Sequence, residues 1–433
     1  MSVREDFKNF LRKFFMVRYF ENGKFQMCWK LPLYTEDWKK QIVAPLPVKF
    51  DARGLYRRFY ASKPIVQNKI VFDNYMGKGF GCNPKYVALK LLEKYPGKFD
   101  IVWLATKKNS YGFPEGIRVV NYASREAREE FATAKVWVTN YHKISFIKKG
   151  MYKRAEQFYI QMWHGSLGIK KIENDVEGLT IDSSWLNMAK LNSHMTDYWI
   201  SNSTFETQIY KRAFWDADKI LEYGHPRDDL LLGDTSSARK TVENFYGFHD
   251  KKILFYAPTF REDYRLDCYR IDYTGLQSAL KAKFGGEWVV LVRLHPRVQS
   301  FAAQVIPQRH SIFDATNYPD IQELLAAADC MITDYSSCIF DYVLTRRPGL
   351  IYAPDLEEYN TERGFYYSLE ETPFPIARDN YQLIENIKKF DLIDYKQKCN
   401  EFLKEKGCME DGHAAERVAD LIAELTSNHN IEP

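Results

Sequence analysis

The chain has 433 residues, which is too long for one ordinary hydrophobic core and favours two domains. Hydrophobic residues make up 45% and charged residues 27% of the sequence, a composition that excludes a disordered chain. The net charge of +4 gives no argument for a nucleic-acid partner, and the seven cysteines include no C-x-x-C pair that would indicate a zinc site.

The first element in chain order is a predicted amphipathic helix over residues 2–18. Its apolar face would consist of Phe7, Phe10, Leu11, Phe14 and Phe15. Large aromatic residues opposite basic ones are typical of a helix at a membrane surface, but the same face could equally pack on the rest of the protein. The sequence has no apolar run long enough to span a bilayer and no apolar core of a signal peptide. We therefore expect a cytoplasmic protein, peripheral at the inner face of the membrane.

A regular alternation of strands and helices begins near residue 66. The predicted strands are Lys69–Tyr75, Phe99–Ala105, Ile117–Tyr122, Lys135–Asn140, Tyr159–Trp163 and Tyr198–Ser201. A glycine-rich turn and a helix over Pro84–Tyr95 follow the first strand, with proline suited to the first helical turn. This order predicts a parallel sheet with helices on both faces.

The pattern is interrupted at Gly233–Lys240 and restarts at Lys252. The predicted strands are Lys252–Pro258, Trp288–Leu294, Ile312–Asp314, Cys330–Thr333 and Gly349–Tyr352. Helices are predicted over Asp320–Ala328 and Ser336–Thr345, and Asn380–Leu425 is predicted to be mainly helical. We therefore expect an N-terminal extension over residues 1–65 and two α/β domains over residues 66–235 and 236–433.

Polar residues follow many of the predicted strands, and ligands of parallel α/β sheets bind beyond the carboxyl ends of the strands. His164 and His295 each follow a strand, one in each half of the chain. Loop arginines would add a cationic rim, at Arg227, Arg261, Arg293 and Arg297. Facing halves with anion donors indicate a ligand that carries a diphosphate. Each histidine could instead be structural, and each arginine taken alone could be a solvated surface charge.

The turn after Cys330–Thr333 carries Asp334, Ser336 and Ser337 ahead of a helical run. The first turn of a helix presents unpaired N–H groups and the positive end of the helix dipole, which together bind phosphate. An ordinary helix cap with nothing bound would have the same sequence, so this turn alone does not establish a site.

Several other site types lack their motifs. The sequence Gly77-Lys-Gly-Phe-Gly81 does not have the spacing of a dinucleotide-binding turn, and there is no P-loop and no G-x-S-x-G nucleophile turn. No cluster of histidines and cysteines has metal-ligand spacing, and Asp314, Asp329 and Asp334 are isolated acids and do not form a D-x-D motif. We therefore expect no metal ion and no cofactor.

An ordered set of short motifs resembles the CDP-glycerol glycerophosphotransferase family of teichoic-acid and capsule biosynthesis. The motifs are Trp163–Ser166, Ser201–Ser203, Gly224–Asp228, Tyr256–Arg261, Leu294–Pro296, Thr333–Asp341, Arg363–Tyr366 and Asp411–Arg417. The resemblance covers roughly residues 68–425. It implies a GT-B architecture of two Rossmann-like domains, with the acceptor half first and the nucleotide half second.

The resemblance also implies an activity: transfer of glycerol phosphate, or another polyol phosphate, from a CDP-polyol to a hydroxyl of a lipid-linked glycan or teichoic-acid acceptor. CMP would be released. It implies that His164 and His295 are the essential histidines. The residues expected to contact the nucleotide are Arg227, Thr259, Arg261, Arg293, Asp334, Ser336, Ser337 and Asp341. Two alternatives stay open, a GT-B glycosyltransferase that uses a nucleotide sugar and a non-catalytic glycan-binding protein.

Overall fold

The computed structural model describes residues 15–19, 25–29, 59–147, 151–176, 183–215 and 217–427. The chain divides into two units, Met1–Ser62 and Lys63–Pro433. In the described part of the first unit, strand β1 (Phe15–Tyr19) pairs antiparallel with strand β2 (Phe25–Trp29).

The amphipathic helix expected over residues 2–18 lies outside the described residues up to position 14. At positions 15–18 the expectation is wrong, because these residues belong to β1 and pair with β2. Pairing across two strands satisfies the backbone N–H and C=O groups that a helix would satisfy internally. No described helix combines the length and the apolar character needed to cross a membrane.

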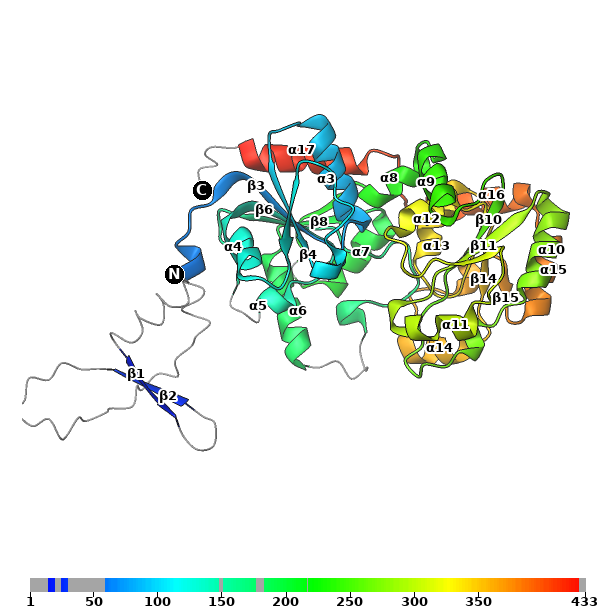
Figure 1. Ribbon diagram of the computed structural model, residues 1–433, viewed down its shortest axis with the longest axis horizontal. Coiled ribbons are helices and arrows are strands. Elements are labelled where there is room, and N and C mark those ends of the chain that lie inside the picture. The colour runs from blue at the N-terminus through cyan, green and yellow to red at the C-terminus, as the bar shows by residue number, and fades with distance from the viewer. Residues whose placement is uncertain are drawn as a thin grey trace, which may run out of the picture. The chain divides into compact units, whose positions relative to one another are not determined.

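The first sheet of the second unit forms what we call lobe 1 (Figure 1). Its strand order is β5-β4-β3-β6-β7-β8-β9, and all neighbouring strands are parallel. The strands are β3 (Val66–Asp73), β4 (Asp100–Ala105), β5 (Ile117–Asn121), β6 (Ala134–Thr139), β7 (Phe158–Gln161), β8 (Tyr198–Ser201) and β9 (Ile220–Glu222). With β3 taken as the first strand, the run β5-β4-β3-β6-β7 has the strand order 3-2-1-4-5 of a doubly wound Rossmann fold.

Helices connect these strands, as parallel pairing requires. They are α3 (Cys82–Lys94), α4 (Arg125–Thr133), α5 (Ile144–Ile147), α6 (Ser183–Met195) and α7 (Thr204–Ala213). The side chain of Ser124 accepts from the N–H of Ala127 at the start of α4, and Ser203 accepts from Glu206 in the same way at α7. Each such cap stabilises its helix by about 1 kcal/mol and fixes where the helix begins.

The second sheet forms what we call lobe 2, with the parallel strand order β12-β11-β10-β13-β14-β15. The strands are β10 (Lys252–Tyr256), β11 (Trp288–Val292), β12 (Ile312–Asp314), β13 (Cys330–Thr333), β14 (Gly349–Tyr352) and β15 (Ile376–Ala377). This is again the doubly wound order. The central strands are apolar on both faces, as in other sheets covered twice by helices, and Leu254, Val290 and Ile332 are fully buried.

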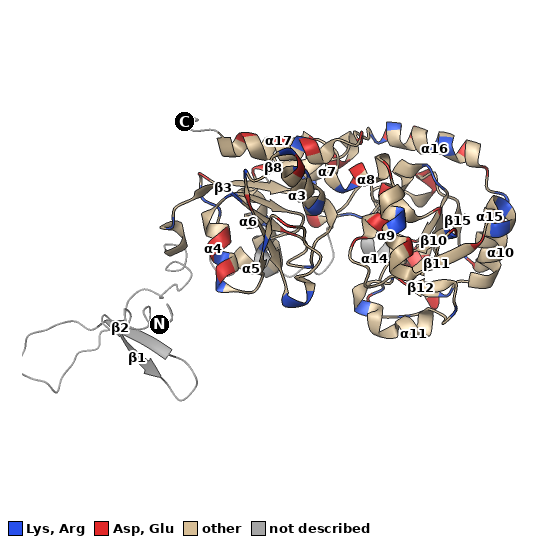
Figure 2. Cartoon of the chain, turned by 45° about the horizontal axis from the view of Figure 1, so that its top comes forward, with Lys and Arg blue, Asp and Glu red and all other residues tan. Residues whose placement is uncertain are grey.

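The helices of lobe 2 lie before its first strand, between its strands and after the last one. They are α8 (Asp229–Leu232), α9 (Ser236–Tyr246), α10 (Tyr273–Phe284), α11 (Ala302–Val305), α12 (Ile321–Ala327), α13 (Cys338–Tyr342), α14 (Leu356–Arg363), α15 (Asn380–Lys388) and α16 (Leu392–Glu405). In α16, Tyr395, Cys399 and Phe402 are buried at helical spacing. Figure 2 shows both signs of charge interspersed along the rest of this helix.

Helix α17 (Ala414–Ser427) returns to lobe 1 and packs beside α3 (Figure 1). Val418 and Ile422 of α17 belong to the same buried cluster as Ile70 of β3. The expected boundary, which put all of residues 236–433 in the second domain, is therefore wrong for this helix. An amphipathic pattern shows that a helix must bury one face, but it does not say which core receives that face.

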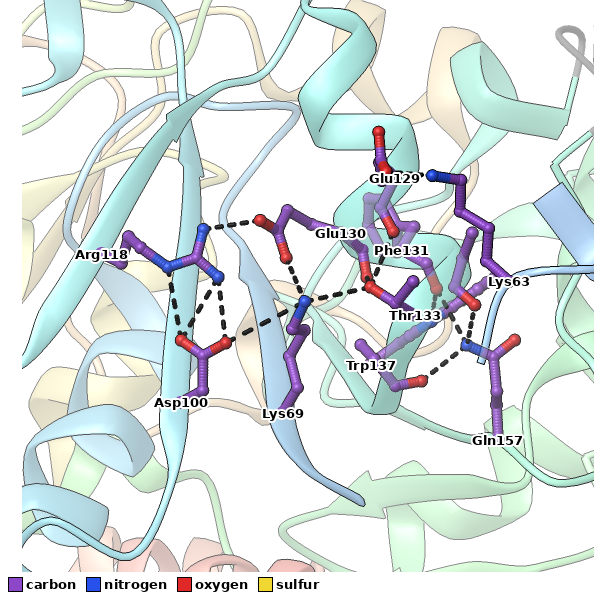
Figure 3. A network of polar contacts seen from close by, with 12 residues as sticks. Lys63, Lys69, Asp100, Arg118, Glu129, Glu130, Phe131, Thr133, Trp137 and Gln157 are labelled. Atoms are coloured by element: carbon purple, nitrogen blue, oxygen red, sulfur yellow. Dashed lines mark hydrogen bonds and ion pairs between the residues drawn. The ribbon is translucent and has the colours of Figure 1, made fainter. Parts of the chain in front are cut away.

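A network of charged side chains joins several strands of lobe 1 (Figure 3). Nζ of Lys69 in β3 lies 2.7 Å from Oε2 of Glu130 in α4. Nη1 of Arg118 in β5 lies 2.5 Å from the other oxygen of Glu130, and Nη2 lies 2.9 Å from Oδ2 of Asp100 in β4. The network ties three strands and a helix together.

Most predicted elements are confirmed. Strands β8, β12, β13 and β14 have the predicted bounds, and the two-lobe α/β architecture is the one that the GT-B resemblance implies. The short edge strands β9 and β15 had no separate prediction. The helix expected over Ser336–Thr345 is the five-residue α13 followed by a 3-10 turn over Val343–Thr345.

Candidate active site

A cavity of about 680 Å³ is lined by residues of both lobes, mainly from loops that follow the carboxyl ends of strands. The lining loops include Tyr75–Lys78 after β3, Trp163–Ser166 after β7, Ala257–Glu262 after β10, Arg293–Arg297 after β11 and Ser336–Cys338 after β13. In each sheet the order reverses between two central strands, β3 and β6 in lobe 1 and β10 and β13 in lobe 2, and ligands of such sheets bind at that point. The volume suits a small organic ligand.

His164 lies in the loop after β7, and its Nδ1 is 2.9 Å from the carbonyl oxygen of Asn140. A carbonyl oxygen can only accept, so Nδ1 carries the hydrogen and Nε2 keeps a lone pair. Asn140 is fully buried at the end of β6, and its side-chain oxygen also accepts from the backbone N–H of Tyr75 at 3.0 Å. One buried amide residue thus fixes both His164 and the loop after β3.

Aromatic rings pack around His164. The ring centroids of Trp163, Tyr75 and Tyr141 lie 4.3, 4.9 and 5.5 Å from that of the imidazole. Burial lowers the pKa of His164 to about 4, and the positive charges of Arg227 and Lys78 also lower it. The imidazole is therefore neutral at pH 7, and Nε2 can accept a proton there.

Three non-glycine residues that line the cavity have left-handed backbone conformations. They are Tyr75 with φ 43°, Met76 with φ 60° and Trp163 with φ 46°. Each such residue costs about 1–3 kcal/mol, and the surrounding structure must supply that energy. Asn83 contributes at Trp163, because its side-chain amide donates to the carbonyls of Met162 and Trp163. Strain of this kind concentrates at functional sites.

His295 follows β11 and is held in the opposite tautomer. Its Nδ1 accepts from the backbone N–H of Arg297 at 3.2 Å, so the hydrogen of the neutral ring is on Nε2. The ring packs on Phe260 with a centroid distance of 5.3 Å. Burial lowers the pKa of His295, and the cations Lys78, Arg297 and Lys170 also lower it. The cavity thus has one imidazole Nε2 that accepts, on His164, and one Nε2–H that donates, on His295.

Positive charge is in excess around the cavity. The basic residues that line it, apart from the histidines, are Lys78, Lys170, Lys171, Arg261, Arg293 and Arg297. Burial lowers the pKa of Lys78, and the neighbouring charge of Arg297 lowers it further. In the part of the chain that the structure describes, the salt bridges include no carboxylate partner for Lys78, whereas Arg297 lies 3.3 Å from Glu262. A cavity with unneutralised cations favours an anionic ligand.

Arg261 lines the cavity, as predicted, but most of its donors are already used. Its Nε and Nη2 donate to Asp355 at 2.6 and 2.9 Å, and Nη2 is 3.0 Å from Oδ2 of Asp334. Asp334 also accepts from the backbone N–H of Thr259 at 2.8 Å. Asp334 itself does not line the cavity. The structure therefore places Asp334 as a support for the Thr259–Arg261 loop, where we expected a nucleotide contact.

Arg227 and Asp341 do not line the cavity either. They form a buried ion pair in which Nε and Nη2 of Arg227 donate to the two oxygens of Asp341 at 2.8 and 3.0 Å. Nη2 also donates to the carbonyl of Gly165 at 2.6 Å, and Gln322 donates to Asp341 at 3.1 Å. Arg227 and Asp341, which we expected to contact the nucleotide, instead form an ion pair between the lobes. Through Arg227 this pair holds Gly165, the residue after His164.

The other predicted residues line the cavity, namely Thr259, Arg293, Ser336 and Ser337. Oγ1 of Thr259 is buried and makes no hydrogen bond within the described residues. Nη1 of Arg293 donates to the carbonyls of Ala315 and Tyr318 at 3.0 and 2.7 Å, which fixes its guanidinium at the wall. Ser337 precedes α13 without capping it, so its hydroxyl is not engaged by the helix end.

The motif Arg363–Tyr366 joins the lobes beside the cavity. The backbone N–H of Lys171 donates to the carbonyl of Gly364 at 3.2 Å, and that of Tyr366 donates to Ile169 at 2.7 Å. Gly364 has φ 68°, a conformation that costs glycine nothing. The hydroxyl of Tyr366 accepts from the N–H of Ile172 at 3.1 Å, which holds the segment after the His164 loop.

Reasoning from the sequence missed several residues of the site. Lys78, Tyr75 and Tyr141 line the cavity, and Asn140 and Asp355 hold its loops. The position of Asn140 as the last residue of a predicted apolar strand was the available indication, since a polar residue there lies at the ligand-binding edge of the sheet. Nothing in the sequence pairs Asp355 with Arg261, which lies 94 residues away.

Comparison with known proteins identifies relatives of most of the second unit. The family model described as CDP-glycerol:poly(glycerophosphate) glycerophosphotransferase matches residues 55–424. A teichoic acid poly(glycerol phosphate) polymerase of Staphylococcus epidermidis is 30% identical over 389 residues, which are 86% of this chain and 52% of that protein. One of Bacillus spizizenii is 31% identical over 374 residues, 83% of this chain and 93% of that protein.

A solved structure gives the same result for the fold. The wall teichoic acid polymerase TagF, as a variant soaked with CDPG, superposes with a TM-score of 0.76 at 28% identity, over 86% of this chain and 93% of that one. The chain spans about half the length of the Staphylococcus epidermidis polymerase. The matched part includes both lobes and every residue of the cavity.

Proposed function

The chain belongs to the CDP-glycerol:poly(glycerophosphate) glycerophosphotransferase family, and we propose that it transfers glycerol phosphate, or another polyol phosphate, from a CDP-polyol to a hydroxyl of a teichoic-acid acceptor. CMP is the second product. The observation that carries the proposal is the pair of histidines in opposite tautomers in one cationic cavity between the lobes. A phosphoryl transfer to an alcohol needs one group that takes a proton and one that stabilises the leaving phosphate.

In the proposed reaction, the acceptor oxygen attacks the β-phosphorus of the CDP-polyol. The new P–O bond forms as the bond from the β-phosphorus to the bridging oxygen breaks, and the electron pair leaves with CMP. Nε2 of His164 takes the hydroxyl proton, since this atom has a lone pair and the ring is neutral. Nε2–H of His295 donates to the leaving phosphate, and Lys78, Arg293 and Arg297 stabilise its charge.

The donor screen is the direct test of this function. Purified protein is incubated with CDP-glycerol and with CDP-ribitol in the presence of a teichoic-acid primer, and CMP and product length are measured. We expect CMP release with one of the two donors, and longer primer by mass. Release of UDP from a UDP-sugar, with no CMP from either CDP-polyol, would instead support the nucleotide-sugar glycosyltransferase.

The histidine assignment has its own test. The His164→Ala variant should lower kcat about 100-fold or more, because positioned proton transfer contributes that much. His249→Ala is the matched control, since His249 is exposed and does not line the cavity. A His164→Ala rate close to that of the wild type excludes this residue as the base.

We also propose that the transfer step uses no metal ion, because the cationic side chains supply the charge that a metal would. Initial rates in assays that contain EDTA should match those without it. A rate that falls with EDTA and returns with Mg²⁺ or Mn²⁺ would show a metal-dependent donor site.

Finally, we propose that the acceptor is attached to a lipid and that residues 1–20 bring the protein to the inner face of the membrane. The support is the set of aromatic and basic residues in that segment. Flotation with anionic liposomes should recover the full chain and lose a protein that lacks residues 1–20. Equal lipid binding by both proteins would remove this role from the segment.

A further inference from the structure

The chain crosses between the lobes twice, and the two crossings lie against each other. We call these segments, residues 223–229 and 406–413, the hinge. The first leads from β9 to α8, and the second leads from α16 back to α17. The carboxylate of Asp229 accepts from the backbone N–H groups of Ala414 and Ala415 at 2.9 and 2.8 Å, which joins the first crossing to the start of α17.

Three residues of the hinge each direct one possible metal-ligand atom toward a common point. His225, Asp228 and Glu410 each offer one ligand atom, and these atoms lie within 4.8 Å of one another. His225 and Asp228 have no exposed surface. Nδ1 of His225, Oδ2 of Asp228 and Oε2 of Glu410 make no hydrogen bond in the described part of the chain. Nδ1 of His225 is 3.8 Å from Oδ2 of Asp228, beyond hydrogen-bond reach.

The second polar atom of each of these side chains contacts a neighbouring residue. Nε2 of His225 lies 3.0 Å from Oε2 of Glu206. Oδ1 of Asp228 accepts from the amide of Gln322 at 3.0 Å, and Oε1 of Glu410 accepts from the backbone N–H of His225 at 2.9 Å. Each side chain is therefore fixed in orientation, and its remaining atom is the one aimed at the common point.

The tautomer of His225 follows from Glu206. Nε2 of His225 faces the carboxyl of Glu206 at 3.0 Å, so the hydrogen of the neutral ring lies on Nε2 and Nδ1 presents a lone pair. This lone pair faces oxygens of two carboxyl groups. Three electron-rich atoms that face one another in a buried place repel unless a positive charge lies among them.

One cation lies beside the cluster: Nε of Arg227 is 3.7 Å from Oδ1 of Asp228, but both oxygens of Asp341 already bind this guanidinium. The carboxyl groups of Glu206 and Asp341 add further negative charge to the same buried region. Gly224 has φ 85°, and a Cβ there would lie 2.7 Å from Oε2 of Glu410, so glycine is what permits the carboxylate to approach.

We propose that His225, Asp228 and Glu410 bind a Zn²⁺ ion that fastens the two crossings together. One imidazole nitrogen and two carboxylate oxygens are ligands that Zn²⁺ accepts, whereas Mg²⁺ and Ca²⁺ need about six or more oxygens. The Glu206–His225 contact supplies the carboxylate–histidine pair that usually supports a zinc ligand. Because the atoms are up to 4.8 Å apart, the side chains close slightly inward on the ion. None of the three ligands lines the cavity, so the proposal does not rest on the proposed function.

The test uses the full chain, prepared without a histidine tag and with Zn²⁺ in the growth medium. Metal analysis should find about one zinc per chain, as a closed protein site binds one ion. Prolonged incubation with dipicolinate should remove the zinc and lower Tm, and Zn²⁺ but not Mg²⁺ should restore it. Co²⁺ added to the stripped protein should give the visible absorption of a protein-bound ion.

Variants then locate the ion. Asp228→Asn and Glu410→Gln should each lose the zinc. Asp411→Asn is the matched control in the same loop, because Asp411 is about half exposed and pairs with Arg417, and it should keep the ion. If Glu410→Gln fails to fold, the dipicolinate experiment on the wild type decides. A wild-type protein without zinc, with a Tm that neither dipicolinate nor Zn²⁺ changes, overturns the proposal and leaves a proton shared by Asp228 and Glu410 as the bridging charge.

Discussion

Arg227 connects the chemistry of the cavity to the contact between the lobes, although it does not face the cavity. Its guanidinium binds Asp341 through two hydrogen bonds and the carbonyl of Gly165 through a third. Both charges are almost completely buried, and removing one partner from such a pair costs about 3–5 kcal/mol because the other charge is left alone.

We therefore expect Arg227→Met to lower the free energy of unfolding by about 3–5 kcal/mol and to lower kcat, because the loop of His164 loses its support. Urea unfolding and steady-state kinetics measure the two effects. The Arg378–Glu357 pair is an exposed counterpart, and Arg378→Met should cost no more than about 1 kcal/mol. Equal, small losses in both variants would show that the buried pair does not stabilise the protein.

The pH dependence of the rate reports on His164. An ordinary histidine would lose its basic form below about pH 6.5, but burial lowers the pKa of His164 to about 4. The ring stays neutral, and able to accept a proton, as the pH falls from 8 to about 5.5. We expect kcat/KM to be flat over that range and to fall only toward the pKa of the buried ring. A rate that is halved near pH 6.5 would contradict this environment.

At the scale of elements, the charged network on strands β3, β4 and β5 of lobe 1 stabilises the sheet. Burial opposes ionisation of Glu130, but hydrogen bonds from Arg118 and Lys69 outweigh it and lower the pKa of Glu130. A carboxyl whose pKa is lower in the folded state stabilises the protein above its unfolded pKa, near 4.3, and loses that contribution as the pH falls through the folded pKa.

Glu130→Gln should therefore lower the free energy of unfolding by about 1–3 kcal/mol at pH 7. The difference from the wild type should shrink as the pH falls below about 4. The adjacent Glu129→Gln is the matched control, since Glu129 is more exposed and should matter little. Urea unfolding at both pH values measures this. A deficit that is the same at pH 7 and at pH 3.5 would mean that charge is not the cause.

The loops after the strands, more than the helices, form the site. Helix α13 is too short for the strong helix-dipole site that its sequence indicated, and a 3-10 turn follows it directly. The tautomers of the two histidines are set by backbone groups, the carbonyl of Asn140 and the N–H of Arg297. The strands therefore contribute to the chemistry through backbone groups at or just beyond their carboxyl ends.

At the scale of the whole molecule, the last helix closes the first lobe. Ile422 of α17 is fully buried in the cluster of lobe 1, while Glu424 is exposed. Ile422→Ala should cost about 2–5 kcal/mol, and Glu424→Ala should change stability by less than about 0.5 kcal/mol. Thermal unfolding measures both. A loss at Ile422 no larger than that at Glu424 would show that α17 does not belong to this core.

The lobes themselves are fixed to each other by several independent contacts. Nζ of Lys85 in α3 lies 2.7 Å from Asp320 and 2.8 Å from Glu323 of lobe 2. The backbone hydrogen bonds of Gly364 and Tyr366 to lobe 1 are a second contact. Because the cavity is lined from both lobes, these contacts also hold its two walls together.

The sequence by itself determined the two α/β halves and the place of the two histidines. Apolar runs that end in polar turns are local patterns, and strands such as Cys330–Thr333 keep them whatever the rest of the chain does. His164 and His295 were predictable for the same reason, since each lies directly after a predicted strand.

Only the tertiary structure decided what the charged residues do. The sequence indicated Arg227, Asp334 and Asp341 as nucleotide contacts, but Arg227 meets Asp341 across 114 residues and Asp334 binds Thr259 and Arg261. An arginine in a loop has the same local sequence whether it faces a ligand or a buried carboxylate. The partner is chosen by packing between distant segments, which also gave α17 to lobe 1.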